Sequence, residues 1–138
     1  MKEKSSCSRR SGCPINVTLE ALGDTWSLLI VRDMMFLGRR TYAEFLNAGE
    51  GIATNILSDR LQKLEAGGII EKRRNPADAR KFIYRLTEKG IDLAPMLIEM
   101  ILWAARHEET AAPPEVVKKM TADRAGVIAE IRKNWETG

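Results

Sequence analysis

Residues 52–90 place the strongest constraint on the fold, because they combine a short amphipathic helix, two glycines and a basic hairpin. Apolar side chains recur at helical spacing between Ala53 and Glu65, and polar side chains fill most of the other positions. The apolar residues are Ile56, Leu57, Leu61 and Leu64, and the polar residues are Thr54, Asn55, Ser58, Asp59 and Gln62. We expect this helix to run from Ala53 to Ala66 and to end at Gly67-Gly68. Such a helix can bury one face in a core and leave its polar face free to enter a groove.

The next segment, Ile69 to Leu86, predicts two short strands around a basic turn, which Asn75-Pro76 marks. Its charged residues are Lys72, Arg73, Arg74, Arg80, Lys81 and Arg85 against Glu71 and Asp78. Positive charge at a hairpin tip suits contact with phosphates. A polar helix followed by a basic hairpin is typical of a winged helix-turn-helix. We therefore predict sequence-specific binding of double-stranded DNA.

Three more helices are expected ahead of this block. The first covers Ile15 to Leu22, and the second, Trp26 to Phe36, is apolar almost all round and should be the buried centre of the core. The third, Thr41 to Asn47, would be the supporting helix of the motif. The linker 48–51 contains two glycines, which permit the tight turn between the supporting and recognition helices.

Two amphipathic helices are expected after the hairpin. One should run from Thr87 to about His107, and the other should begin at Pro113-Pro114, where the chain breaks. A terminal helix must bury its apolar face, and a second copy of the chain offers a surface for it. We therefore predict a homodimer. The residues assigned to its interface are Leu97, Ile101, Val127, Ile131 and Trp135.

The length of 138 residues is that of one domain with terminal extensions. The predicted fold class is mainly α with a small β-hairpin: a winged helix-turn-helix with N- and C-terminal dimerisation helices. We expect a flexible basic arm over 1–12, the winged helix-turn-helix with its long helix over 13–108, and a C-terminal dimerisation helix over 114–136. The longest apolar run, 26–37, is too short to span a membrane, and no signal-peptide core is present. We expect a cytoplasmic protein without a membrane partner.

Enzyme and metal chemistry find little support. His107 is the single histidine, Cys7 and Cys13 are the only cysteines, and no paired carboxylates or phosphate-binding glycine loop is present. We expect no catalytic residue, no metal and no cofactor. The net charge is only +3, so the DNA prediction depends on where the cations lie and not on their total.

Three ordered blocks resemble a known family. Cys13-Pro14 is followed by LGDTWSLLIVRD at 22–33, by IATNILSDRL at 52–61 and by YRLTEKG at 84–90. These blocks are similar to those of the HxlR-type transcriptional regulators, and they cover most of the chain from Cys13 to about Trp103. The resemblance implies a winged helix-turn-helix that binds DNA. The family commonly has an arginine where this chain has Thr41, and that arginine contacts the DNA backbone. In this chain Arg40 could make the contact instead.

The predicted DNA contacts lie on the recognition helix, on the hairpin and at Arg40. They are Thr54, Asn55, Ser58, Arg60, Gln62, Arg73, Arg74, Arg80, Lys81 and Arg40. Asn55 is the best candidate for adenine readout, and the wing cations are candidates for phosphate or minor-groove contact. Arg60, beside core leucines, either holds a phosphate or clamps the fold, and Asp59 is expected to pair with Arg60 or Lys63. The alternative is that the polar face of the helix and the charge run of the hairpin are merely solvated. The chain would then be a winged-helix protein-interaction module that does not read DNA.

Cys13 is a candidate redox sensor. The resemblance implies this role, because in some family members the oxidation or alkylation of a cysteine at this place alters DNA binding. Arg9 and Arg10 and the start of a helix favour a reactive thiolate, and Cys7 could be the resolving thiol. The alternative is that Cys13 packs beneath the dimer helices. A small-molecule or oxidant effector could also bind between the core and the C-terminal helices, but no convergent polar cluster in the sequence identifies it.

Overall fold

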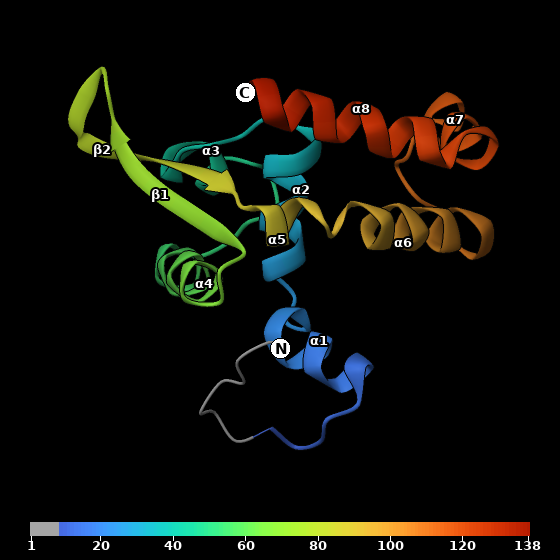
Figure 1. Ribbon diagram of the computed structural model, residues 1–138, viewed down its shortest axis with the longest axis horizontal. Helices are drawn as coiled ribbons and strands as arrows, with labels where there is room; N and C mark the ends of the chain where they lie inside the picture. The colour runs from blue at the N-terminus through green and yellow to red at the C-terminus, as the bar shows by residue number, and fades with distance from the viewer. Residues whose placement is uncertain (1–8) are drawn as a thin grey trace.

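The central helix of the fold is α2 (Ser27–Phe36) (Figure 1). The computed structural model describes residues 9–138. The remaining elements are α1 (Pro14–Leu22), α3 (Tyr42–Leu46), α4 (Thr54–Ala66), β1 (Ile70–Asn75), β2 (Asp78–Leu86), α5 (Glu88–Ile91), α6 (Ala94–His107), α7 (Pro114–Ala122) and α8 (Arg124–Thr137). Helix α2 packs against α4, β2 and α8. This arrangement confirms the predicted fold class, mainly α with a small β-hairpin, but does not test the dimerisation role given to the terminal helices. Cys7 and most of the predicted basic arm lie outside the described residues.

Local signals in the sequence explain where the first helices begin and end. Ahead of α2, the carboxylate of Asp24 accepts hydrogen bonds from the backbone N–H groups of Trp26 at 3.0 Å and Ser27 at 3.1 Å. At the start of α3, Thr41 and Glu44 form a reciprocal capping box. The first four predicted helices agree with the observed α1 to α4 to within one or two residues at each end.

The hairpin is antiparallel and turns at residues 76–77. Its register pairs Ile70 with Leu86 at the base and Arg74 with Phe82 near the tip, and the pairing shifts after Arg74. Gly90, at the start of α5, allows the base of the hairpin to approach closely, because a Cβ there would lie 2.2 Å from the Ile69 carbonyl oxygen. The wing therefore projects from a tightly packed base.

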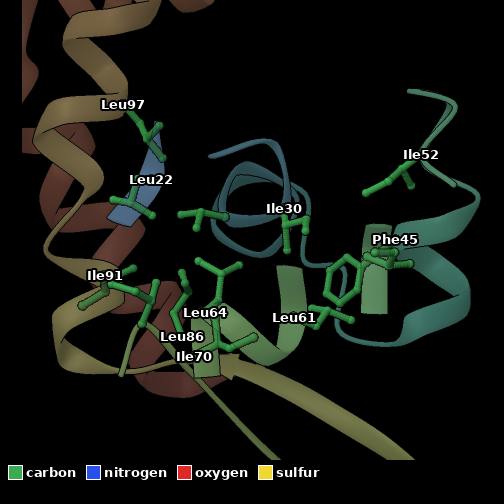
Figure 2. Packing of buried hydrophobic residues seen from close by; sticks show 13 residues of the cluster. Leu22, Ile30, Phe45, Ile52, Leu61, Leu64, Ile70, Leu86, Ile91 and Leu97 are labelled. Carbon is green, nitrogen blue, oxygen red and sulfur yellow. The ribbon is translucent and has the colours of Figure 1, made fainter. Parts of the chain in front are cut away.

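Buried apolar side chains from most of these elements form one core (Figure 2). Leu57, Leu61 and Leu64 line the inner face of α4, as their spacing predicts. They meet Ile30 of α2 and Phe45 of α3, and the base of the hairpin closes the core from another side. The recognition helix is thereby held by one complete face while its other face stays free.

The predicted helix from Thr87 to His107 is wrong as a single element. Thr87 caps only the short α5, where its hydroxyl accepts from the N–H of Gly90 at 3.2 Å. The chain then begins α6 at Ala94, with Pro95 in its first turn. Proline has no N–H and is accommodated in a first turn but not inside a helix, which explains the break.

The predicted single C-terminal helix is also two helices. Asp123 separates α7 from α8 in a non-helical conformation, and its carboxylate accepts from the N–H of Gly126 at 3.0 Å. The chain reverses at this residue, and α8 returns along α6 toward the hairpin (Figure 1).

The reason given for a dimer through the five assigned residues is therefore wrong, because the same chain packs against all of them. Val127 and Ile131 of α8 pack with Ile101 of α6 against a buried cluster of Ile98, Leu102 and Met120. Leu97 is buried in the main core. The indole of Trp135 donates a hydrogen bond to the Leu86 carbonyl at 2.8 Å. Within residues 9–138, no helix has the length and apolar character that a membrane span requires.

Candidate nucleic-acid interface

The outer face of α4 carries four exposed side chains that are polar and uncharged. Thr54, Asn55, Ser58 and Gln62 are all exposed, opposite the leucines that face the core. Three of the four lie in the first two turns of the helix, the part that reaches base edges when a recognition helix enters a major groove.

The first turn of α4 has no side-chain cap, and a residue of the preceding helix α3 holds this turn in position. Ala53 occupies the N-cap position and supplies no side-chain cap, so the first backbone N–H groups have no partner from that side chain. Tyr42 of α3 donates from its hydroxyl to the Thr54 carbonyl at 3.1 Å and lies 3.5 Å from the Ser58 hydroxyl. This position of Tyr42 was not predicted. The free amides and fixed orientation suit an anion at this helix end.

The side chain of Arg60 is bound to carboxylates of its own chain. Its Nε donates to the Asp24 carboxylate at 2.8 Å, and the same guanidinium pairs with Asp59. Burial by itself raises the pKa of Asp24, but hydrogen bonds from the Ser27 hydroxyl, from Arg60 and from the cap N–H groups outweigh burial and hold that pKa well below its usual range. These contacts support the clamp alternative for Arg60. They also place Asp59 in the expected internal pair.

The wing divides its cations between two faces, because successive side chains of a strand point to opposite sides. Lys72 reaches Glu65 of α4 at 4.0 Å and lies 4.7 Å from the centre of the Phe82 ring. Arg74 is on the same face, 5.1 Å from that ring. Its guanidinium donates to the Ala79 carbonyl at 2.6 Å.

The other wing cations differ in whether an internal ion pair competes with a phosphate for their charge. Arg80 pairs with Asp78 at 3.1 Å, although its side chain is largely exposed. Arg73 and Lys81 are exposed, and neither makes an ion pair within the described part of the chain. A phosphate would therefore meet Arg73 and Lys81 without first displacing an internal partner.

Arg40 lies where the supporting helix meets the wing. Its backbone N–H donates to the Glu44 carboxylate at 2.9 Å, and its carbonyl accepts from the N–H of Tyr84 at 2.7 Å. Its guanidinium has no ion-pair partner among residues 9–138, whereas that of Arg39 is bound to the buried Asp33 at 2.9 Å. The main chain of Arg40 is thus fixed and its charge is free.

The elements that carry these residues lie together. Figure 1 shows α4 and the β1–β2 hairpin on one side of the molecule, away from α6 and α7. The structure therefore brings the predicted helix and wing contacts to one side. Arg60 is the one predicted contact on α4 that is engaged with a carboxylate of another element.

Cys13 is exposed at the N-cap of α1. The backbone N–H of Asn16, and then that of Ile15, lower the pKa of the Cys13 thiol from its ordinary value. The thiol is therefore not packed beneath other helices in this chain. Its predicted partner Cys7 lies outside the described residues.

An apolar groove between α1, α2 and α6 was not predicted. It has a volume of about 630 Å³, and its lining includes Ile15, Leu19, Leu28, Met96 and Met100. The exposed fractions of its large apolar side chains are 72% for Ile15, 58% for Leu19 and 48% for Met100. The spacing of Ile15 and Leu19 signalled an apolar face on α1, but not that this face stays uncovered in one chain.

Residues 21–112, more than half of the chain, match the model of the HxlR-like helix-turn-helix family. An HTH-type transcriptional regulator of Synechocystis sp., sll1512, is 36% identical over 88 residues, which are 64% of this chain and 64% of that protein. The chain thus spans less than two thirds of the length of this relative. Among solved structures, the transcription factor PA1607 superposes with a TM-score of 0.67 at 34% identity, covering 75% of this chain and 71% of that one. The oxidised form of the redox regulator HypR superposes with a TM-score of 0.62 at 28% identity, covering 71% of this chain and 100% of that one. On the strength of the family match, the chain belongs to the HxlR-like helix-turn-helix family.

Proposed function

We propose that this protein is a transcription regulator that binds a near-palindromic DNA operator as a homodimer. The observation that carries the proposal is the position of the free polar face of α4 beside a hairpin that presents unpaired cations on the same side of the molecule. The helix enters the major groove, and the wing grips the flanking backbone or minor groove. The relatives named as transcriptional regulators support this reading.

The two surfaces have separate tasks in this proposal. Asn55 reads adenine through its amide, and Thr54, Ser58 and Gln62 supply the other contacts of α4. Arg40, Arg73 and Lys81 bind phosphates, since their guanidinium or ammonium groups have no ion-pair partner in the described residues. Arg74 and Arg80 contribute after they exchange their internal partners for phosphate, and Arg60 remains the clamp of α4.

The test is a titration of the purified protein with duplexes selected from a random pool, at several salt concentrations. If Arg40, Arg73 and Lys81 of both subunits each neutralise one phosphate, the plot of log affinity against log salt has a slope of about −5, which steepens to about −9 if Arg74 and Arg80 also do. The selected duplex should bind more tightly than a scrambled one. A flat plot, or equal affinity for both duplexes, would favour the alternative of a protein-interaction module.

We propose that the second subunit covers the groove between α1 and α6. Three large apolar side chains of its lining, Ile15, Leu19 and Met100, are exposed, which is unusual for a monomer surface. Leu19→Lys should shift the mass in light scattering from dimer to monomer. Leu37→Lys is the matched control, because Leu37 is also exposed but lies outside the groove lining. A monomeric wild-type protein, or a dimer that tolerates Leu19→Lys, would exclude this interface.

We also propose that DNA binding responds to modification of Cys13. The thiol is exposed, its pKa is lowered, and it lies two residues before Ile15 in the proposed dimer face. N-ethylmaleimide should reduce operator affinity in the wild type and in Cys7→Ser, and leave Cys13→Ser unchanged. An equal response of Cys13→Ser and the wild type would remove Cys13 from the mechanism.

A further inference from the structure

A cavity lies between the end of α2, the base of β2 and the last turns of α8. Its volume is about 310 Å³, which is at the lower end of the range for small-molecule sites. Its apolar wall includes Met34, Phe36, Leu86, Ile91 and the indole of Trp135. The third side of the cavity is α8, which lies beyond residues 21–112 that match the family model.

The polar wall of this cavity is cationic. Arg39, Arg40 and Arg85 line it, and no aspartate or glutamate does. The guanidinium of Arg39 forms an ion pair with the carboxylate of Asp33 at 2.9 Å, so its charge is already balanced. Arg40 has no ion-pair partner among the described residues.

Arg85 is held in place by the C-terminal helix. Its guanidinium donates to the Trp135 carbonyl at 2.9 Å and lies 4.5 Å from the centre of the indole ring. These are contacts with a neutral carbonyl and a neutral ring, so the charge of Arg85 has no counter-charge there. Arg40 and Arg85 therefore line a largely apolar space, and neither has an ion-pair partner among residues 9–138. The terminal residue, Gly138, also lines this space.

The turn that delivers the arginines is fixed by a glycine. Gly38 has φ of +67°, a left-handed conformation that glycine adopts at little cost. It ends α2 and turns Arg39 and Arg40 toward the cavity lining. The hydrogen bond from the Tyr84 N–H to the Arg40 carbonyl, 2.7 Å long, ties this turn to the wing strand.

We propose that this cavity is an effector site for a small aromatic carboxylate. The carboxylate binds between Arg40 and Arg85, and the aromatic body lies against Trp135 and the apolar side chains of α2. The carboxylate would pair with two guanidinium groups that have no ion-pair partner among the described residues, and the ring would fill the apolar part of the cavity.

The effector would act on DNA binding through Arg40. A carboxylate on this guanidinium competes with the phosphate that we assign to it, so the bound effector lowers operator affinity. This regulatory part rests on the proposed function. The binding part does not, because it concerns only the cavity and the ligand.

Calorimetric titration of the full chain with cinnamate, and with the neutral cinnamamide as control, tests the binding. We expect one cinnamate for each chain and at least tenfold weaker binding of the amide, since a charge-assisted pair contributes about a factor of ten or more. Arg40→Gln should weaken cinnamate binding by a similar factor. Arg73→Gln makes the same change of charge on the exposed wing and should leave cinnamate affinity unchanged.

Three results would overturn the site: no heat from cinnamate at millimolar concentration, equal affinity for acid and amide, or full affinity in an Arg40→Gln protein whose circular dichroism matches the wild type. The regulatory part is tested by operator affinity with and without saturating cinnamate, where a several-fold loss is expected. Cinnamate binding with unchanged operator affinity would overturn regulation alone. A protein that binds cinnamate but no DNA would overturn the proposed function and leave the cavity site standing.

Discussion

Removing the carboxylate of Asp24 tests whether Arg60 clamps the fold. Asp24→Ala removes the cap of α2 and the pair with Arg60, both of which involve a partly buried carboxylate. The cap contributes about 1 kcal/mol and the charge-assisted bond about 2 kcal/mol, so the free energy of unfolding should fall by about 3 kcal/mol. Asp24→Asn keeps an acceptor for the cap and should cost about half as much. Urea denaturation followed by circular dichroism at a fixed protein concentration measures both changes.

The contribution of Asp24 to the free energy of unfolding should also depend on pH. Its pKa in the folded protein lies below the unfolded value of about 3.9, so ionisation of Asp24 favours folding. The contribution is complete above that unfolded value and decreases as the pH falls through the folded pKa. The stability difference between the wild type and Asp24→Asn should therefore be constant near neutral pH and shrink below about pH 4.

Arg60→Gln separates the clamp from a phosphate contact. A clamp predicts a loss of about 1 to 2 kcal/mol in the free energy of unfolding and a double-mutant coupling with Asp24 of about 1 kcal/mol. Unchanged stability together with a flatter salt dependence of DNA binding would refute the clamp and restore Arg60 as a phosphate contact.

Three further substitutions probe the fold by urea denaturation. Leu57→Ala, at a fully buried position on the inner face of α4, should cost about 3 kcal/mol, and a loss below 1 kcal/mol would mean that α4 is not anchored as described. Gly38→Ala should cost about 1 kcal/mol through backbone strain alone, because φ is +67° and a Cβ there meets nothing within 4 Å. Trp135→Phe should cost about 1 kcal/mol by removing the 2.8 Å hydrogen bond to the Leu86 carbonyl, and a neutral result would show that α8 is not fixed there.

The part of the fold that the sequence predicts is the part specified by nearby residues. The cap at Asp24 and the glycine after α4 each act within a few positions, so these helix ends could be located. The leucines of α4 likewise predicted which face is buried. The turn signal at Asn75-Pro76 placed the cations on a hairpin, although only the structure shows which of them have internal partners.

The errors come from interactions that periodicity does not encode. Pro95 is compatible with a kinked helix or with a new one, and helical spacing continues across the break. The apolar face of α8 predicted burial but not which surface covers it, and α6 of the same chain does so. The pair of Arg60 with Asp24 joins residues 36 positions apart. The converging arginines of the cavity come from segments that only the fold brings together.

The most direct test of the account measures operator and scrambled-duplex affinity against salt concentration for Asn55→Ala and Arg73→Gln. Asn55→Ala should reduce the preference for the operator by about 1 to 3 kcal/mol and keep the salt slope, because it removes a base contact. Arg73→Gln should reduce the slope by about 2 for the dimer and keep the preference, because it removes a phosphate contact from each subunit. If both variants bind both duplexes as the wild type does, α4 and the wing do not form the DNA-binding surface.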